Sequence, residues 1–128
     1  MRVLISLEID GLPPTVNQMY RTGRYSARYK RADTLKYQKY VIGLLRSRWG
    51  QLPPYELPIE LRIILTTGDR RKWDIDNRVK ALQDCLSKAG IIEDDSQVEI
   101  LHVERNYGKK AATYIEVREN DRTERISD

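Results

Sequence analysis

The chain has 128 residues and a mass of 15.0 kDa, the size of a single domain with one hydrophobic core. A content of 40% hydrophobic residues excludes disorder of the whole chain, the single cysteine excludes an internal disulfide, and no stretch approaches the roughly 18 apolar residues that cross a membrane. The net charge is only +4, but residues 21–48 contain many basic side chains and one acid, Asp33, whereas residues 93–95 are all acidic. We therefore expect a soluble, cytoplasmic protein with a basic surface around a local acidic pocket.

The N-terminal part of the chain predicts a strand, a loop and a helix. Apolar residues alternate over residues 3–9, the period of a strand with one face on the core. Residues 15–24 lack an apolar period and predict a loop, which leads into a short strand at residues 25–29. Asp33 is a suitable N-cap for a helix that ends at Gly50 and is basic on its exposed face. The apolar face of this helix consists of Leu35, Ile42, Leu45 and Trp49.

A second strand and a second helix follow. Residues 59–65 alternate well enough to form a strand. The next helix is predicted to start near Asp74 or Asp76 and to end at Ala89, just before Gly90. Its buried face consists of Val79, Leu82 and Leu86, at spacings of three and four residues.

Two further strands complete the predicted domain. Residues 98–105 and 111–118 are expected to form a hairpin that is joined through residues 106–110. Residues 119–128 form a polar tail with little to bury. The domain is therefore predicted to span residues 1–118.

Two aspartates one residue apart mark the predicted start of the second helix. Residues two apart on a regular helix point about 200° apart, so Asp74 and Asp76 converge only if Asp74 lies in the extended approach to the helix. Mg²⁺ takes oxygen ligands and is usually held by one or two carboxylates together with substrate phosphate. Lys80 follows Asp76 by four residues on the same helical face, where an ammonium group could touch a phosphate or its developing negative charge.

Each part of this cluster also has a plainer interpretation. Acidic residues in the first turn of a helix are favoured by the helix dipole, and Asp76 with Lys80 is an ordinary pair at i and i+4. The acidic residues 93–95 suit a solvated turn before a strand. On spacing alone, capping and catalysis both stay open.

An ordered set of residues resembles the RusA family of Holliday-junction resolvases. Its central block comprises Asp74-Ile75-Asp76-Asn77, Lys80, Asp84, Lys88-Ala89-Gly90 and Asp94-Asp95. Its opening block comprises Leu12-Pro13-Pro14-Thr15, Asn17 and Tyr20-Arg21. The resemblance covers roughly residues 3–118. Together with the predicted elements, it implies an α+β, RusA-like fold in which two helices pack on a mixed, mostly antiparallel sheet.

The resemblance implies a homodimeric, Mg²⁺-dependent endonuclease, with Mn²⁺ as a substitute, that resolves four-way DNA junctions by paired symmetric cuts in DNA recombination and repair. The family's catalytic and metal-binding aspartates fall on Asp74, Asp76 and Asp95, and its catalytic lysine falls on Lys80. The carboxylates would hold the metal, which activates a water and stabilises the pentavalent phosphate.

Basic and aromatic residues are expected to supply the DNA-binding surface. Cations that neutralise phosphates release counterions and give affinity that is largely independent of sequence, and aromatic rings stack on unpaired bases. The candidates are Tyr20, Arg21, Arg24, Arg28, Lys30, Arg31, Arg70, Arg71, Lys72 and Trp73. Trp73 departs from the family, whose basic run commonly reaches the first aspartate. For each residue of the stretch from Arg21 to Arg48 the alternative is a solvated helix face, with tyrosines packed by their rings.

Two other functions stay open. One is a Mg²⁺-dependent nuclease that acts on flaps or single strands, which metal ligands alone do not distinguish from a resolvase. The other is a non-catalytic DNA-binding module in which Asp74 and Asp76 cap a helix. The second alternative explains the basic charge but not the spacing of the aspartates and the lysine.

Overall fold

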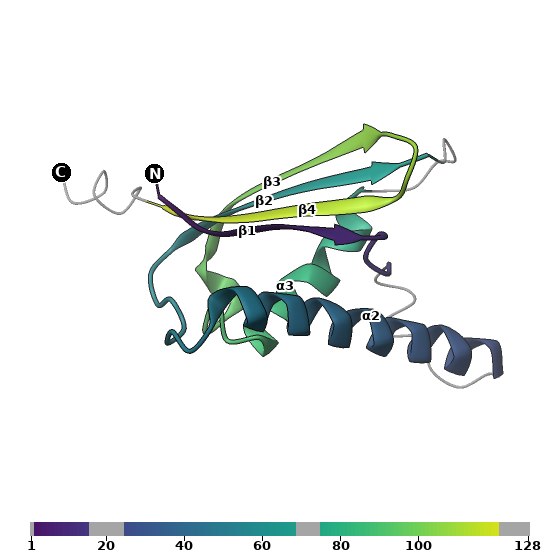
Figure 1. The fold of residues 1–128 in the computed structure, drawn as a ribbon, viewed down its shortest axis with the longest axis horizontal. Coiled ribbons are helices and arrows are strands. Elements are labelled where there is room, and N and C mark those ends of the chain that lie inside the picture. Colours follow the sequence, from purple (N-terminus) through teal and green to yellow (C-terminus); the bar gives the residue numbers. More distant parts are fainter. Residues whose placement is uncertain (1, 16–24, 69–74, 121–128) are drawn as a thin grey trace.

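The computed structural model describes residues 2–15, 25–68 and 75–120, with the backbone alone for residues 25–31. Within these ranges the fold consists of strands and helices in the order shown in Figure 1. They are β1 (Val3–Asp10), α2 (Tyr25–Trp49), β2 (Ile59–Thr67), α3 (Val79–Lys88), β3 (Val98–Tyr107) and β4 (Ala112–Glu119). Two short 3₁₀ helices, η1 (Ile75–Arg78) and η2 (Asp95–Gln97), precede and follow α3. None of the described helices is long and apolar enough to cross a membrane.

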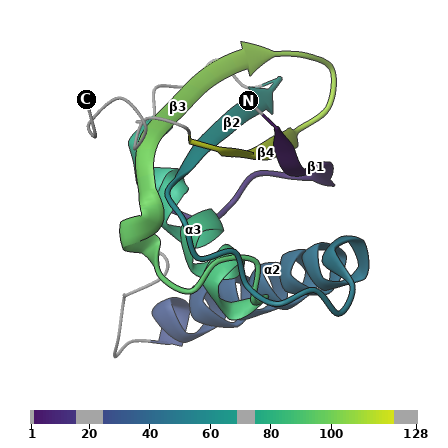
Figure 2. The same cartoon turned by 90° about the vertical axis from the view of Figure 1, so that its left-hand side faces the viewer.

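The strands form one mixed sheet in the order β1-β4-β2-β3. β4 pairs antiparallel with both β1 and β2, whereas β2 pairs parallel with β3. Both helices cover the same face of this sheet, α2 packs against α3, and α2 also contacts β1 (Figures 1 and 2). The predicted α+β fold with a mixed, mostly antiparallel sheet is therefore confirmed.

The predicted hairpin of residues 98–105 and 111–118 is wrong, because β2 lies between β3 and β4. The side chains of β2 alternate between buried and half-buried over its whole length, as expected of a strand with neighbours on both edges. The link from β3 to β4 crosses the end of β2, where the Gly108 amide donates to Thr67 O at 3.2 Å. A Cβ atom on Gly108 would lie 2.9 Å from Thr66 Cγ2, so this close crossing favours glycine.

Helix α3 matches its prediction in the residues that it buries. Val79, Leu82 and Leu86 all lie in the core, and Gly90 follows the helix with a φ of 76° that suits glycine. The start differs, since the chain forms the 3₁₀ helix η1 before the α-helix begins at Val79. Cys85 is also buried on this face, and burial raises the pKa of its thiol to about 12.

Helix α2 begins at Tyr25, so the predicted short strand at residues 25–29 and the N-cap at Asp33 are both wrong. Residues 25–32 contain Ala, Arg and Lys but no Gly or Pro. These residue types lose little side-chain freedom in a helix, and they outweigh the preference of Tyr25 and Tyr29 for strands.

The buried face of α2 also differs from the prediction. Leu35 is 58% exposed, and the core side of the helix instead includes two polar residues. The buried residues are Thr34, Gln38, Val41 and Leu45. Neighbouring helical residues point about 100° apart, so a buried stripe through Thr34 and Gln38 leaves Leu35 in solvent. Ile42 and Trp49 are partly buried against the core, and Leu45 is fully buried, as predicted.

The folded domain extends slightly beyond its predicted end at residue 118. Glu119 closes β4, and Asn120 is buried. The amide of Asn120 donates to Pro58 O at 3.2 Å, and its Nδ2 donates to Glu99 Oε2 at 3.2 Å. Residues 121–128, the rest of the predicted tail, lie outside the described residues.

Candidate functional site

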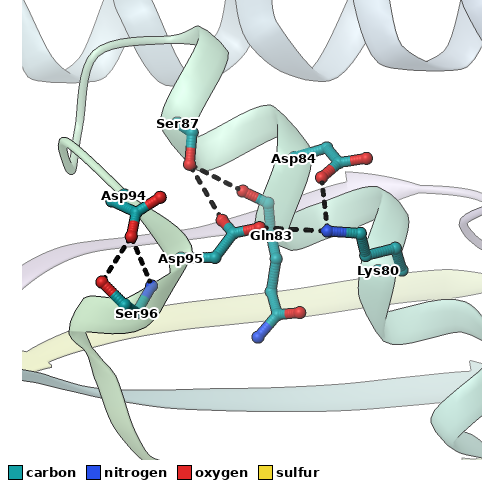
Figure 3. Close-up of polar contacts among 7 residues, drawn as sticks. All are labelled: Lys80, Gln83, Asp84, Ser87, Asp94, Asp95 and Ser96. Atoms are coloured by element: carbon teal, nitrogen blue, oxygen red, sulfur yellow. Dashed lines mark hydrogen bonds and ion pairs between the residues drawn. The ribbon is translucent and has the colours of Figure 1, made fainter.

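The polar face of α3 and the short helix η2 meet beside the sheet, and their side chains form a connected cluster (Figure 3). Lys80, Asp84 and Ser87 lie at intervals of four and three residues, so they share one face of α3. Asp95 approaches this face from η2. The apolar face of the same helix is anchored in the core, so the polar face is held in a fixed direction.

Lys80 connects two carboxylates. Its Nζ lies 3.1 Å from Asp84 Oδ1 and 3.2 Å from Asp95 Oδ2. The hydrogen bonds to Asp84 and Asp95 raise the pKa of Lys80, so the ammonium stays charged at neutral pH. Lys80 is half-buried, and one positive charge stands between two negative groups.

Asp95 is held at both of its carboxylate oxygens. Oδ2 faces Lys80, whereas Oδ1 accepts a hydrogen bond from Ser87 Oγ at 2.9 Å (Figure 3). The Asp95 side chain is 31% exposed, so solvent or a ligand still reaches it. The last residue of the acidic run 93–95 is thus brought onto the polar face of α3.

The neighbouring Asp94 has a structural task. Its Oδ2 accepts hydrogen bonds from the Ser96 amide, at 3.2 Å, and from the Ser96 hydroxyl, so it caps η2. These hydrogen bonds from Ser96 lower the pKa of Asp94. The plainer interpretation of the acidic run, a turn before a strand, therefore fits Asp94, which is exposed and caps η2, whereas Asp95 contacts Lys80.

Gln97 fixes the turn from both sides, and the sequence interpretation missed it. Its Oε1 accepts from the amides of Glu93 and Asp94 at 2.7 and 3.0 Å. Its Nε2 donates to the carbonyl oxygens of Tyr55 and Leu57 at 2.7 and 3.0 Å. The signal was present, because Asp94 and Gln97 have the spacing of a capping box.

Asp76 lies at the entrance to α3, in the 3₁₀ helix η1, and its side chain is exposed. The helix η1 is tied down by two neighbours of Asp76. Ile75 packs against the core, and Arg78 Nη1 donates to Pro13 O at 2.6 Å. This hydrogen bond links η1 to the segment around Pro13, just after β1. Lys80 comes one helical turn after Asp76.

The structure describes only some of the other predicted site residues. Asp74 and the basic and aromatic residues 70–73 lie outside the described residues, as do Tyr20, Arg21 and Arg24. For Arg28, Lys30 and Arg31 the structure describes the backbone of α2 alone. Among the described residues, no three His, Cys, Asp or Glu side chains lie close enough together to hold a metal ion. The structure thus joins Lys80 to Asp95 and leaves the convergence of the three aspartates as a prediction.

Comparison with known proteins assigns this arrangement to a class of nucleases. The family model described as endodeoxyribonuclease RusA matches residues 10–118 of the chain. That match runs from the last residue of β1 to the penultimate residue of β4 and includes the cluster on α3 and η2. The chain belongs to the RusA family, and the resemblance seen in its sequence motifs is confirmed.

Curated relatives support the same assignment. A crossover junction endodeoxyribonuclease RusA of Aquifex aeolicus (strain VF5) is 29% identical over 116 residues, which cover 89% of this chain and 90% of the relative. Proteins of the same name from Escherichia coli (strain K12) and Enterobacteria phage 82 are each 34% identical over 86 residues. These two matches cover 67% of this chain and 70% of each relative.

Proposed function

We propose that this chain is a Mg²⁺-dependent endonuclease that resolves four-way DNA junctions by paired symmetric cuts, in DNA recombination and repair. The observation that carries the proposal is the contact of Lys80 with Asp95, which pairs a cation with a carboxylate across α3 and η2. Its context is a family of endodeoxyribonucleases whose relatives are named for crossover junctions. Family membership supports the nuclease activity, and the names of the relatives support the substrate.

The proposed metal ligands are Asp74, Asp76 and Asp95. The donor set fits Mg²⁺, because carboxylate oxygens are the ligands that this hard cation takes. The exposure of Asp76 and the partial exposure of Asp95 leave both carboxylates accessible to a cation and its waters. When bound, the ion would supply Lewis acidity and a nucleophilic water at neutral pH, and Mn²⁺ would substitute for it.

Lys80 is the proposed electrostatic catalyst. Hydrolysis adds a water oxygen to phosphorus and breaks the bond to the 3′ oxygen, and negative charge grows on the phosphate during this change. The raised pKa of Lys80, which results from its hydrogen bonds to Asp84 and Asp95, keeps a full positive charge there. An ammonium group already fixed beside the reacting phosphate stabilises that charge without further reorganisation.

We further propose a homodimer, since two copies related by a two-fold axis would place two sites on two opposite strands of a four-way junction with matching symmetry. The basic residues of segments 21–48 and 70–72 would bind phosphates, and Trp73 would stack on an unpaired base. Affinity for DNA should then fall steeply with added salt.

The test is to incubate the purified protein with a labelled four-way junction, a flap and a linear duplex, each with Mg²⁺ or with EDTA. The expected result is paired symmetric nicking of the junction that depends on Mg²⁺. Asp95→Asn should abolish cutting and keep junction binding, whereas Glu93→Gln, an exposed acid of the same run, should cut like the wild type. Preferred cutting of the flap would show that the substrate is a flap and not a junction. Binding of DNA without cutting in Mg²⁺ or Mn²⁺ would favour a non-catalytic DNA-binding module.

A further inference from the structure

We propose that Ser87 is a positioning residue of this site: its hydroxyl fixes the plane of the Asp95 carboxylate and keeps Oδ2 available for Lys80 and a divalent cation. The inference rests on the proposed function of Asp95. Its direct support is the hydrogen bond from Ser87 Oγ to Asp95 Oδ1 at 2.9 Å, which joins α3 to η2 (Figure 3).

The Ser87 hydroxyl has two acceptors within reach and one proton. Asp95 Oδ1 lies at 2.9 Å, and the carbonyl oxygen of Gln83, one turn earlier on the helix, lies at 3.5 Å. A hydroxyl bonds more strongly to a charged carboxylate than to a neutral carbonyl, and the shorter distance agrees with this preference. The bond to Gln83 is the common way for a helical serine to satisfy its own hydroxyl, and here it is the weaker of the two.

Asp95 needs an external contact to fix its orientation. Its backbone is set by the cap that Asp94 and Gln97 place on η2, but the terminal torsion of an aspartate is broad and intrinsically loose. The side chain is 31% exposed, so packing alone does not enclose the carboxylate. The carboxylate plane is therefore set by the two groups that contact its two oxygens, Ser87 and Lys80.

During the proposed reaction Asp95 can lose its contact with Lys80 but keeps its contact with Ser87. Lys80 has a second partner, Asp84, at 3.1 Å, and so it keeps an ion pair when a cation or a phosphate draws it away from Asp95. Ser87 contacts the opposite oxygen and does not compete for Oδ2. It is thus the contact that still orients Asp95 once Oδ2 is engaged, and hydrogen bonds of this kind to a metal-binding carboxylate typically change metal affinity or activity 10- to 100-fold.

The test measures metal binding as well as cutting. In Ser87→Ala, Mn²⁺ affinity, followed by electron paramagnetic resonance of free Mn²⁺, should fall about 10-fold, and the Mg²⁺ concentration for half-maximal junction cutting should rise by about the same factor. Ser87→Thr keeps the hydroxyl and should restore both values. The midpoint of thermal unfolding should fall only slightly in Ser87→Ala, because the better helix propensity of Ala offsets part of the lost hydrogen bond to Asp95.

Two controls separate this role from a general effect on the turn. Ser96→Ala removes a hydroxyl that donates to Asp94, but the Ser96 amide still donates to Asp94, which caps η2, so the Mn²⁺ affinity of this variant should match the wild type. In the Asp95→Asn background, adding Ser87→Ala should change Mn²⁺ affinity no further, because Ser87 acts through the Asp95 carboxylate.

A Mn²⁺ affinity in Ser87→Ala equal to that of the wild type would overturn the assignment, and so would equal losses in Ser87→Ala and Ser87→Thr. A wild type that binds Mn²⁺ but cuts no junction contradicts the proposed substrate, while the Ser87→Ala affinity still decides the role of Ser87. A wild type that neither binds Mn²⁺ nor cuts DNA overturns the proposed function and this inference together.

Discussion

Lys80 Nζ lies 3.2 Å from Asp95 Oδ2, which joins the first turn of α3 to the turn that follows the helix. The two residues are 15 positions apart, and α3 with the chain reversal after it brings them together. In the proposed mechanism this pair would supply a fixed cation for the phosphate and a carboxylate for a metal.

Loss of the lysine charge should impair the chemical step. We expect Lys80→Gln to lower the rate of junction cutting about 10²- to 10³-fold at saturating Mg²⁺, because an electrostatic contact to the transition state is removed. Junction affinity measured in Ca²⁺ should change little. Lys88→Gln, a basic residue at the other end of α3, is the matched control and should cut normally. Equal losses of rate in both variants would assign Lys80 to general DNA binding.

The capping box should contribute to the stability of the turn that carries Asp95. Gln97→Ala removes a side chain that bonds two amides and two carbonyls, and we expect the free energy of unfolding to fall by about 1–2 kcal/mol. Urea denaturation measures this change. Glu93→Ala, an exposed position beside it, should stay within about 0.5 kcal/mol of the wild type. A Gln97→Ala variant as stable as Glu93→Ala would argue against the box.

Glu116 on β4 should make stability depend on pH in the acid range. Burial, which raises the pKa of Glu116, is outweighed by hydrogen bonds from Arg118 and Tyr114, so the pKa is lowered. A carboxyl group whose pKa is lowered in the folded state stabilises the protein at pH values above its unfolded pKa of about 4.3. This stabilisation is lost as the pH falls through the folded-state pKa. Glu116→Gln should therefore destabilise the protein at pH 7 and flatten the loss of stability below about pH 4.5. Denaturation midpoints across pH 3–7 test this, and parallel curves for both proteins would contradict it.

The crossing of the β3 to β4 link over β2 should tolerate no side chain at Gly108. A Cβ atom there would lie 2.9 Å from Thr66 Cγ2, so Gly108→Ala should cost about 1–3 kcal/mol of unfolding free energy. Gly43→Ala provides the opposite control, because Gly43 lies inside α2 and its Cβ would meet nothing within 4 Å. That variant should gain about 0.5–1 kcal/mol. Thermal unfolding of both variants tests these expectations. A Gly108→Ala variant that is more stable than the wild type would show that the crossing has room for a side chain.

Features that depend on near neighbours in the chain were predictable. The period of apolar residues gave β1, β2 and the buried face of α3, because burial on one face imposes a spacing on the sequence. The sequence motifs on α3 and η2 also pointed to the family that residues 10–118 match. The start of α2 was missed although it is local, since tyrosine favours strands and the surrounding Ala, Arg and Lys favour a helix.

Features that depend on distant pairing were decided by the tertiary structure. The sequence placed residues 98–105 next to residues 111–118, but β2 pairs with both β3 and β4 and so separates them. By itself the sequence determined that Lys80 and an acidic run exist near one helix. Only the packing of α3 against the core and the cap on η2 decided that Asp95 contacts Lys80 and Ser87 while Asp94 caps the turn. Adjacent aspartates have the same chemistry, and the direction of the backbone at each one gives them different partners.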